Sequence, residues 1–379
     1  MPGEIQSSYN SSIISGTCVC PGQAIGRFHV YNKETEDIFE KGDILYIPSE
    51  IGHYPIKLLR MAGGIICSYY TTYSHLASVA SALRIPCIVG AVFSAIPENL
   101  SVVFLNTYYL ILTEDLGVKG TIDRTEENEW NKNINNIIVA NFNNSPLVYL
   151  QSFDYIGSYI DKISGIFLDS LIFENDLFSV TELIEKLNVI CKHHSDIIVY
   201  YRFTTNILGI KDERVSLQQE YNFVHSLLIN EIKTNTFIAS AKSYEDIVQF
   251  RHKILSEFNG TSTMKIGSMI ENLEILEDLI EILRKRLIDF GVIGINDLTN
   301  SCLGLDRDDP HNQEYYLLDS SNVLKALSYI HNTFVDYHTI DYISFPKYPR
   351  FLSDYKTMCG IGFSHYFGND SLFYNMNEL

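Results

Sequence analysis

The dipeptide Ser74-His75 is a place in the chain where residue type and position together suggest chemistry. The segment "TTYSHLASVASAL" has Ser74 at a position typical of a helix N-cap, which places His75 in the first helical turn. Free backbone N–H groups and the positive end of the helix dipole lie at that end, and both favour a phosphorylated imidazole. An ordinary surface or core histidine beside a helix cap fits the same local pattern.

Two carboxylates form a second candidate group. Glu271 ends the apolar run "MKIGSMIE", and Asp297 ends "FGVIGIND". If these runs are neighbouring strands of a barrel, both acids lie at its C-terminal rim, where barrel enzymes place their catalytic groups. Hard oxygen ligands suit Mg²⁺, which takes one or two carboxylates together with water and substrate oxygens. Alternatively, each acid caps the helix that follows it.

The elements that would position these residues follow from the hydrophobic pattern. Residues 1–125 contain short β runs punctuated by Gly and Pro, with helical patterning in a few places such as 74–83. After residue 146, apolar strand runs alternate with helical segments. We expect strands at 147–151, 164–169, 196–203, 236–242, 264–271, 290–297, 339–345 and 358–367. Helical periods are found at 179–194, 243–258, 272–287 and 320–334. Eight strands with crossover helices predict a lean (β/α)8 TIM barrel.

A linker is expected between these two regions. The stretch "RTEENEWNKNINNIIVANFNNS" is dominated by Asn and Glu, which is more typical of a connection than of a core. We therefore predict a first domain at residues 1–125, a linker at 126–145 and a barrel domain at 146–379. A chain of 379 residues is long enough for two domains.

Composition excludes several classes of function. The formal net charge is −18, which disfavours a nucleic acid or an anionic membrane as partner, because phosphate groups attract clustered Lys and Arg. Seven cysteines without a CxxC pair indicate reduced thiols and not a disulfide framework or a zinc site. No signal peptide or membrane span is apparent, so a cytoplasmic location is expected.

The segment "AGGIICSYYTTYSHLASVASALRIPCIVGA" resembles the swivelling phosphohistidine domain of the phosphoenolpyruvate (PEP)-utilising enzymes, such as pyruvate phosphate dikinase, PEP synthase and enzyme I of the sugar phosphotransferase system. The pieces "AGGII", "SH", "ASVASAL" and "IPCIVG" stand in the family's order. The segments "CVCPGQAIGRFHV" and "KGDILYIP" resemble the family's opening and its approach to the motif. The resemblance implies a small β/β/α swivelling domain in which His75 carries a phosphoryl group by nucleophilic catalysis.

The second region resembles the PEP/pyruvate-binding barrel of the same family. The segments "IGSMIEN" and "RLIDFGVIGINDLTNSCLGLDRDD" are similar to two barrel signatures, and "IIVYYRFTTN" is similar to a third, weaker one. By this resemblance Glu271 and Asp297 hold Mg²⁺ and Asn296 binds the substrate phosphate. Arg307 lies beside the phosphoryl group, and Arg202 is a second phosphate clamp, because a guanidinium matches phosphate bidentately.

The sequence also departs from the family pattern. Tyr70 and Thr71 replace a glycine pair before the histidine, and Ser81 stands where an arginine is common. The second barrel strand, "GIFLDSLIF", has Leu168 and Asp169 and no arginine.

The family's seventh strand ends in a cysteine that protonates the enolate of pyruvate. The comparable spacing here falls near Ser344 or Phe345, while Cys359 lies in the run expected to form the next strand. Loss of that acid would impair the pyruvate half of the chemistry without abolishing phosphoryl transfer.

The resemblance implies a phosphotransferase of the PEP-utilising type, dikinase-like or enzyme I-like. His75 would carry a phosphoryl group between a Mg²⁺-dependent barrel site for PEP, pyruvate or a related acid and a separate partner. Because the chain has no ATP-grasp domain of its own, the partner is expected to be an ATP-grasp or phosphocarrier protein, and a homodimer is possible. Two alternatives stay open: the same chemistry with another small-molecule acceptor in specialised biosynthesis, and a degenerate relative that binds without turnover.

Overall fold

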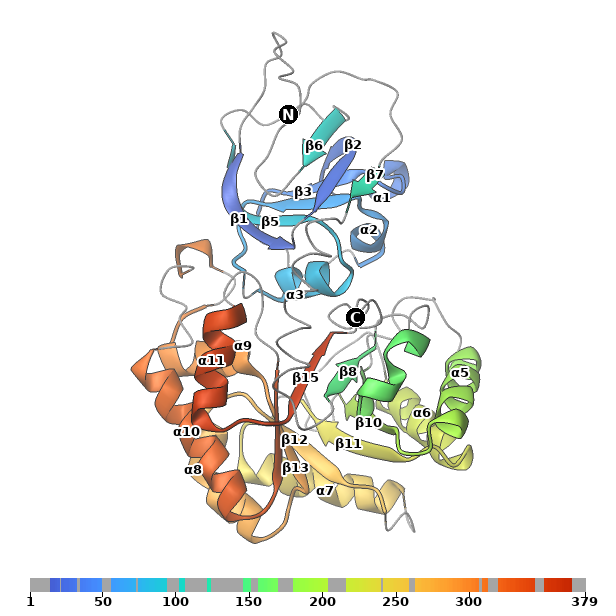
Figure 1. Cartoon of the computed structure of the whole chain (residues 1–379), viewed down its shortest axis with the longest axis vertical. Coiled ribbons are helices and arrows are strands. Elements are labelled where there is room, and N and C mark those ends of the chain that lie inside the picture. Colours follow the sequence, from blue (N-terminus) through green and yellow to red (C-terminus); the bar gives the residue numbers. More distant parts are fainter. Residues whose placement is uncertain are drawn as a thin grey trace. The chain divides into compact units, whose positions relative to one another are not determined.

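The structure is a computed structural model, shown in Figure 1. It describes residues 14–20, 22–32, 35–49, 56–72, 74–93, 102–105, 121–123, 146–150, 156–169, 180–203, 216–239, 241–258, 263–306, 309–312, 320–344 and 351–369. The chain divides into two compact units, Met1–Asn133 with Asp306–Tyr315 and Ile134–Leu305 with Tyr316–Leu379. The predicted linker, 126–145, lies outside the described residues. The predicted domain boundaries at 125 and 146 therefore stay predictions.

The first unit is built on a seven-stranded mixed sheet with the order β1-β5-β4-β3-β2-β6, and β7 also pairs with β2. The strands β2, β3, β4 and β5 are parallel neighbours, whereas β1, β6 and β7 pair antiparallel. The strands are β1 (Ile14–Cys20), β2 (Gln23–Val30), β3 (Ile44–Ile47), β4 (Gly64–Cys67), β5 (Cys87–Phe93), β6 (Val102–Leu105) and β7 (Thr121–Asp123). The helices are α1 (Thr35–Ile38), α2 (Ile56–Met61) and α3 (His75–Ala82).

Helix α3 packs closely on this sheet because its inward residues are small. Ala77 and Ala80 are fully buried, and they share a core cluster with Leu76, Ile65 and Val89. The helix therefore needs little space above the strands.

The second unit is a closed parallel barrel in the order β10-β11-β12-β13-β14-β15-β8-β9. Its strands are β8 (Leu147–Tyr149), β9 (Gly165–Asp169), β10 (Ile198–Phe203), β11 (Thr234–Ile238), β12 (Ile266–Ile270), β13 (Phe290–Ile293), β14 (Ile340–Ser344) and β15 (Tyr366–Asn369). The α-helices are α5 (Val180–His193), α6 (Leu217–Ile229), α7 (Tyr244–Glu257), α8 (Leu273–Arg284), α9 (Ile295–Leu303), α10 (Ser321–Asp336) and α11 (Phe351–Ile361). Short 3-10 turns occur at Ile156–Ser158, Ile160–Lys162 and Pro310–Asn312. The predicted (β/α)8 barrel is thus confirmed.

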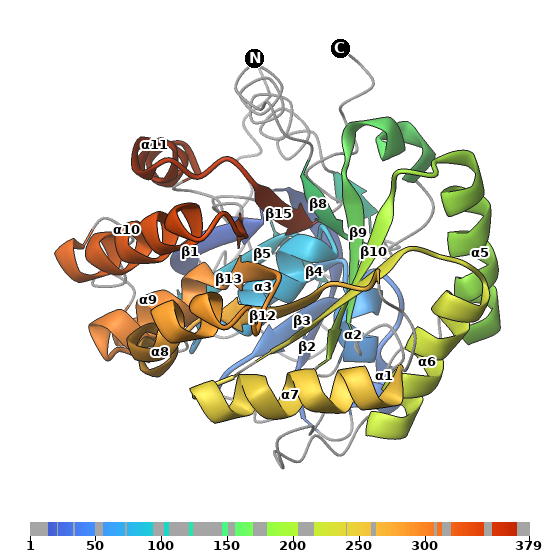
Figure 2. The same cartoon turned by 90° about the horizontal axis from the view of Figure 1, so that it is seen from below.

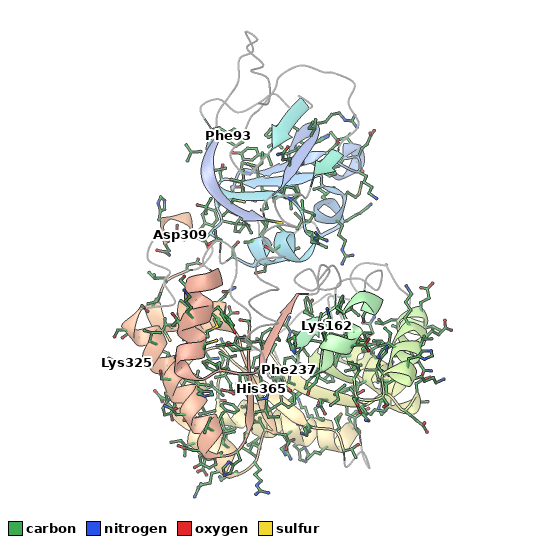
Figure 3. The ribbon with its side chains drawn as sticks, viewed as in Figure 1. Phe93, Lys162, Phe237, Asp309, Lys325 and His365 are labelled. Carbon is green, nitrogen blue, oxygen red and sulfur yellow. The ribbon has the colours of Figure 1, made fainter. Side chains whose placement is uncertain are left out.

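The helices lie outside the strands, as Figure 2 shows for α5, α6, α7, α8 and α10. Each presents one apolar face to the barrel; α8, for example, buries Ile275, Leu279 and Ile282. Figure 3 shows the same contrast for single residues, since Phe237 lies among the strands whereas Lys325 projects from the outer side of α10. Within the described residues, no helix combines the length and apolar character that crossing a bilayer requires.

Two predicted strand ends are wrong. The predicted strand at 358–367 begins only at Tyr366, because residues up to Ile361 form α11. Cys359 is therefore a helix residue. The predicted strand at 290–297 ends at Ile293, and Asp297 lies in the first turn of α9. In both places an apolar run continues from one element into the next, so hydrophobicity alone does not mark the boundary.

Candidate active site

His75 is the first residue of α3, directly after the end of the loop from β4. Ser74 is the N-cap residue, as predicted, and its hydroxyl oxygen accepts a hydrogen bond from the Ala77 N–H at 3.1 Å. The Ser74 N–H donates to the Thr71 carbonyl at 3.2 Å, which closes the turn before the helix. The His75 side chain lies outside the described part of the structure. Its backbone position is at the helix end that favours negative charge.

The loop before His75 is anchored to the sheet by the side chains of Ser68, Tyr70 and Thr71. Tyr70 is 1% exposed and belongs to the core beneath α3. The Ser68 hydroxyl donates to the Ala91 carbonyl at 2.7 Å and lies 2.8 Å from the Tyr46 hydroxyl. Thr71 is also buried. Tyr70 and Thr71, the residues in place of the glycine pair, are thus buried against the first unit, and Ser68 adds hydrogen bonds.

Arg202 lies near the C-terminal end of β10 and is partly buried. Its guanidinium carbon is 5.3 Å from the centroid of the Phe167 ring, and Nη1 is 3.5 Å from Met269 Sδ. These soft contacts hold the guanidinium in one place near the C-terminal rim of the barrel. In the parallel pairing of β9 and β10, Asp169 is the register partner of Arg202.

Glu271 follows β12, and Asn296 and Asp297 belong to the first turn of α9, which follows the neighbouring strand β13. The Glu271 carboxylate lies close to Gly294: a Cβ atom added at Gly294 would be 3.1 Å from Glu271 Oε2. The two acids therefore come from adjacent strand ends, although Asp297 is one helical turn beyond its strand.

Neither acid serves as a helix cap. The N-cap of α8 is Asn272, whose side chain accepts from the Ile275 N–H, and the N-cap of α9 is Gly294. The alternative that Glu271 and Asp297 are the N-cap residues of these helices is thus wrong.

The two carboxylates at this rim are ligands of the chemical type that Mg²⁺ takes. Within the described residues, no group of three or more His, Cys, Asp or Glu side chains is placed to hold a metal ion, so a site there would have at most two such protein ligands. Mg²⁺ needs only one or two carboxylates and completes its shell with water and substrate oxygens. Glu271 and Asp297 are the residues that would hold it.

Two of the other predicted residues, Arg307 and Phe345, lie outside the described residues. Cys359 is on α11, where its Sγ is 3.4 Å from the Tyr366 hydroxyl, and it does not lie at a strand end. Ser344 is the last residue of β14, the seventh strand of the barrel counted from β8.

The sequence did not single out the aromatic filling of the barrel beneath this rim. The core cluster here contains Phe167, Tyr200, Phe237, Met269, Phe290 and Tyr342, with Leu147 and Val292. The Tyr200 and Tyr342 hydroxyl oxygens are 3.2 Å apart. Burial and, second, the neighbouring Tyr200 raise the pKa of Tyr342 far above its usual range. The alternation of side chains along "IVYYRF" and "IDYIS" allows both tyrosines to face the barrel interior. Recognising the pair also requires the closed order of the strands, which the sequence does not give.

Two protein-family models match parts of this chain. Residues 39–108 match the model described as PEP-utilising enzyme, mobile domain, and residues 224–339 match the model described as PEP-utilising enzyme, PEP-binding domain. These two matches show a similarity to both domains of the PEP-utilising enzymes. His75 lies inside the first match, and Glu271, Asn296 and Asp297 lie inside the second.

The remaining comparisons add only distant similarities. No curated protein matches the chain. An HpcH/HpaI aldolase from Desulfitobacterium hafniense DCB-2 has 12% identity and a TM-score of 0.39, covering 60% of this chain and 87% of that one. A HpcH/Hpal aldolase/citrate lyase family protein from Burkholderia cenocepacia J2315 has 8% identity and a TM-score of 0.42, covering 66% and 96%. Macrophomate synthase has 12% identity and a TM-score of 0.43, covering 64% and 83%. These similarities are too remote to bear on function.

Proposed function

We propose that this chain is a phosphotransferase in which His75 carries a phosphoryl group between a small acid bound in the barrel and a separate partner protein. The observation that carries the proposal is the position of His75, the first residue of a capped helix inside the segment that matches the mobile domain. A phosphohistidine at that position would be stabilised by free backbone N–H groups and by the helix dipole.

The transfer would balance as follows when PEP is the donor. A ring nitrogen of His75 attacks the phosphorus atom, a new N–P bond forms, and the bond from phosphorus to the enol oxygen breaks. The enolate that leaves takes a proton and becomes pyruvate. Arg202, Asn296 and Arg307 would bind the phosphoryl oxygens, and Glu271 and Asp297 would hold Mg²⁺. A bound Mg²⁺ would supply neutralising charge to the phosphoryl oxygens.

The test is incubation of the protein with PEP labelled in the phosphoryl group, in the presence of Mg²⁺. We expect acid-labile, base-stable label on the wild type and none on His75→Ala. His252→Ala is the matched control, because His252 is exposed on α7. Label that persists on His75→Ala, or a wild type that takes no label from PEP or from any other phosphoryl donor tried, would contradict the proposal.

A second candidate function keeps the phosphohistidine but changes the acceptor to another small molecule, as in specialised biosynthesis. It is favoured by the end of β14, where the last residue is Ser344, and by the location of Cys359 on α11. A serine hydroxyl is a far weaker acid than a thiol, so enolate protonation would be poorly supported there. If this function holds, His75 becomes labelled by the partner and passes the label to an acid other than pyruvate.

The partner is proposed to be an ATP-grasp or phosphocarrier protein, and the reaction is proposed to take place in the cytoplasm. A homodimer is carried over from the family as part of the same proposal. The non-catalytic binding alternative would be favoured by binding of PEP without any label on His75.

A further inference from the structure

Three cysteines of the first unit lie on three neighbouring strands. Cys20 ends β1, Cys87 begins β5 and Cys67 ends β4, and the sheet order places these strands side by side as β1-β5-β4. All three cysteines belong to the core cluster that also contains Leu76 and Ala77 of α3. Their side chains therefore lie on one face of the sheet, beneath α3, with Cys87 on the middle strand of the three.

Cys20 and Cys87 are placed as the two halves of a disulfide would be. They are register partners in the antiparallel pairing of β1 and β5. Such partners have Cα atoms about 4.5–5.5 Å apart, and the Cα atoms of a disulfide are usually about 4.4–6.8 Å apart. The register shifts between Cys18 and Cys20, so that Cys20 belongs to the core cluster whereas Cys18, the partner of Ile88, does not. The irregularity thus brings Cys20, and not Cys18, to Cys87.

Cys67 has a different relation to Cys87. In the parallel pairing of β4 and β5 the register partner of Cys87 is Ile65, so Cys67 lies two residues further along its strand. With a rise of about 3.3 Å per residue and about 4.8 Å between strands, the two Cα atoms are roughly 8 Å apart, which a disulfide spans only if the backbone moves. Cys67 instead forms a hydrogen bond with Cys87. This hydrogen bond and, second, burial raise the pKa of the Cys87 thiol well above its usual range.

The two members of the pair differ in reactivity. Cys20 is 5% exposed, whereas Cys87 is 1% exposed. An oxidant reacts with the thiolate form of cysteine, and the raised pKa keeps Cys87 protonated at neutral pH. Oxidation therefore begins at Cys20, and Cys87 is the thiol that completes the bond.

We propose that Cys20 and Cys87 form a redox-sensitive modification site, at which a peroxide converts the two thiols into a disulfide between β1 and β5. The Cys20 thiolate attacks one peroxide oxygen, an S–O bond forms, the O–O bond breaks and water leaves, which gives a sulfenic acid. The Cys87 sulfur then attacks the Cys20 sulfur, the S–S bond forms, and the sulfenic oxygen leaves as water with the Cys87 proton. The two thiols together lose two electrons and two protons, and one peroxide becomes two waters.

The disulfide fastens the sheet beneath the helix that begins at His75. β1 is at one end of the strand order, and β5 is the strand that follows α3 along the chain. The link closes a loop that contains β2, β3, β4 and α3, and such a loop restricts the unfolded chain. The oxidised protein should therefore unfold at a higher temperature than the reduced protein. The inference does not depend on the proposed function.

The test is a map of the disulfide in the full-length protein. Trypsin cleaves after Lys and Arg, which leaves Cys18 and Cys20 in fragment 1–27, Cys67 in fragment 61–84 and Cys87 in fragment 85–119. The reduced protein is treated with hydrogen peroxide, the remaining thiols are alkylated, and the fragments are analysed by mass spectrometry with and without dithiothreitol.

We expect the wild type to give fragment 1–27 linked to fragment 85–119, and dithiothreitol to separate them. Cys18→Ala is the matched control and should keep the link, whereas Cys20→Ala should lose it. The rise in unfolding temperature on oxidation should likewise be present in Cys18→Ala and absent from Cys20→Ala.

The other outcomes overturn the proposal. Fragment 61–84 linked to fragment 85–119 would make Cys67 the partner, and a link that persists in Cys20→Ala would assign it to Cys18. A wild type that forms no link with peroxide, or forms it only after unfolding in urea, excludes the site. The map of the wild type decides these cases even if a variant fails to fold, and none of them bears on the phosphohistidine at residue 75.

Discussion

Substitution of Gly294 by alanine should weaken metal binding by displacing Glu271. An added Cβ would lie 3.0 Å from Met269 Cε, 3.1 Å from Glu271 Oε2 and 3.3 Å from Glu271 Cβ. The backbone of Gly294, with φ −82° and ψ 89°, does not require glycine, so the effect is one of space alone. The methionine end can move away, but the glutamate must shift by a few tenths of an ångström, and overpacking of this kind costs about 1–3 kcal/mol.

The assay is titration with Mn²⁺ as a spectroscopic substitute for Mg²⁺, together with unfolding in urea. We expect Gly294→Ala to bind Mn²⁺ about tenfold more weakly, which is about 1.4 kcal/mol, and to remain folded. Gly360→Ala is the matched control, because a Cβ there meets nothing within 4 Å and the residue lies in α11. It should bind Mn²⁺ as the wild type does and be more stable by up to about 1 kcal/mol.

Two results would refute this reasoning. If Glu271→Gln weakens Mn²⁺ binding and Gly294→Ala does not, the carboxylate tolerates the methyl group without leaving the ion. If neither variant changes the affinity, Glu271 does not hold the metal.

Substitutions at three further residues test other parts of the structure. Burial raises the pKa of Asp341 from 3.8 to about 6, against the hydrogen bond with His331 at 2.8 Å, so the free energy of unfolding should fall by about 3 kcal/mol as pH rises from about 4 to 6. Asp341→Asn should flatten that slope in urea titrations at several pH values, and an unchanged slope would exclude Asp341 as its source. Burial pushes the pKa of Asp43 upward, but hydrogen bonds from His29 and the Glu40 N–H hold it below its usual range, so the first unit should lose stability as pH falls below about 4. Asp43→Asn should remove this acid limb in thermal unfolding, and a wild-type acid limb in the variant would contradict the assignment. Tyr70→Ala should cost about 3–5 kcal/mol and Tyr70→Phe about 1 kcal/mol or less in denaturant unfolding, because the ring fills the core beneath α3; equal costs would show that the hydroxyl matters more than the ring.

The fold could be predicted to a large extent from the sequence because its elements have simple signals. Most barrel strands are apolar runs bounded by polar residues, and Ser74 followed by small residues marks the start of α3. The errors occur where this contrast is lost. Residues 358–361 are as apolar as a strand but continue α11, and Ile295 is as apolar as the strand that precedes it although α9 begins there.

The arrangement of the site was less predictable for a different reason. Both faces of a barrel strand are buried, so the sequence does not tell which of Tyr200 and Tyr201 points inward. Only the closed order of the strands assigns Tyr200 to the interior and Tyr201 to Glu220 of α6, at 3.1 Å. The same limit applies to Gly294, whose closeness to Glu271 depends on the register of β12 and β13.

Transfer from the barrel substrate to His75 is the central claim, and a single-turnover measurement tests it most directly. Limiting PEP is mixed with excess protein and Mg²⁺, the reaction is quenched at successive times, and pyruvate and phosphohistidine are counted in the same samples. The account predicts that both products rise with one rate constant and in equal amounts, and that His75→Ala gives neither. Pyruvate formed by His75→Ala at the wild-type rate, or phosphohistidine without pyruvate, would contradict it.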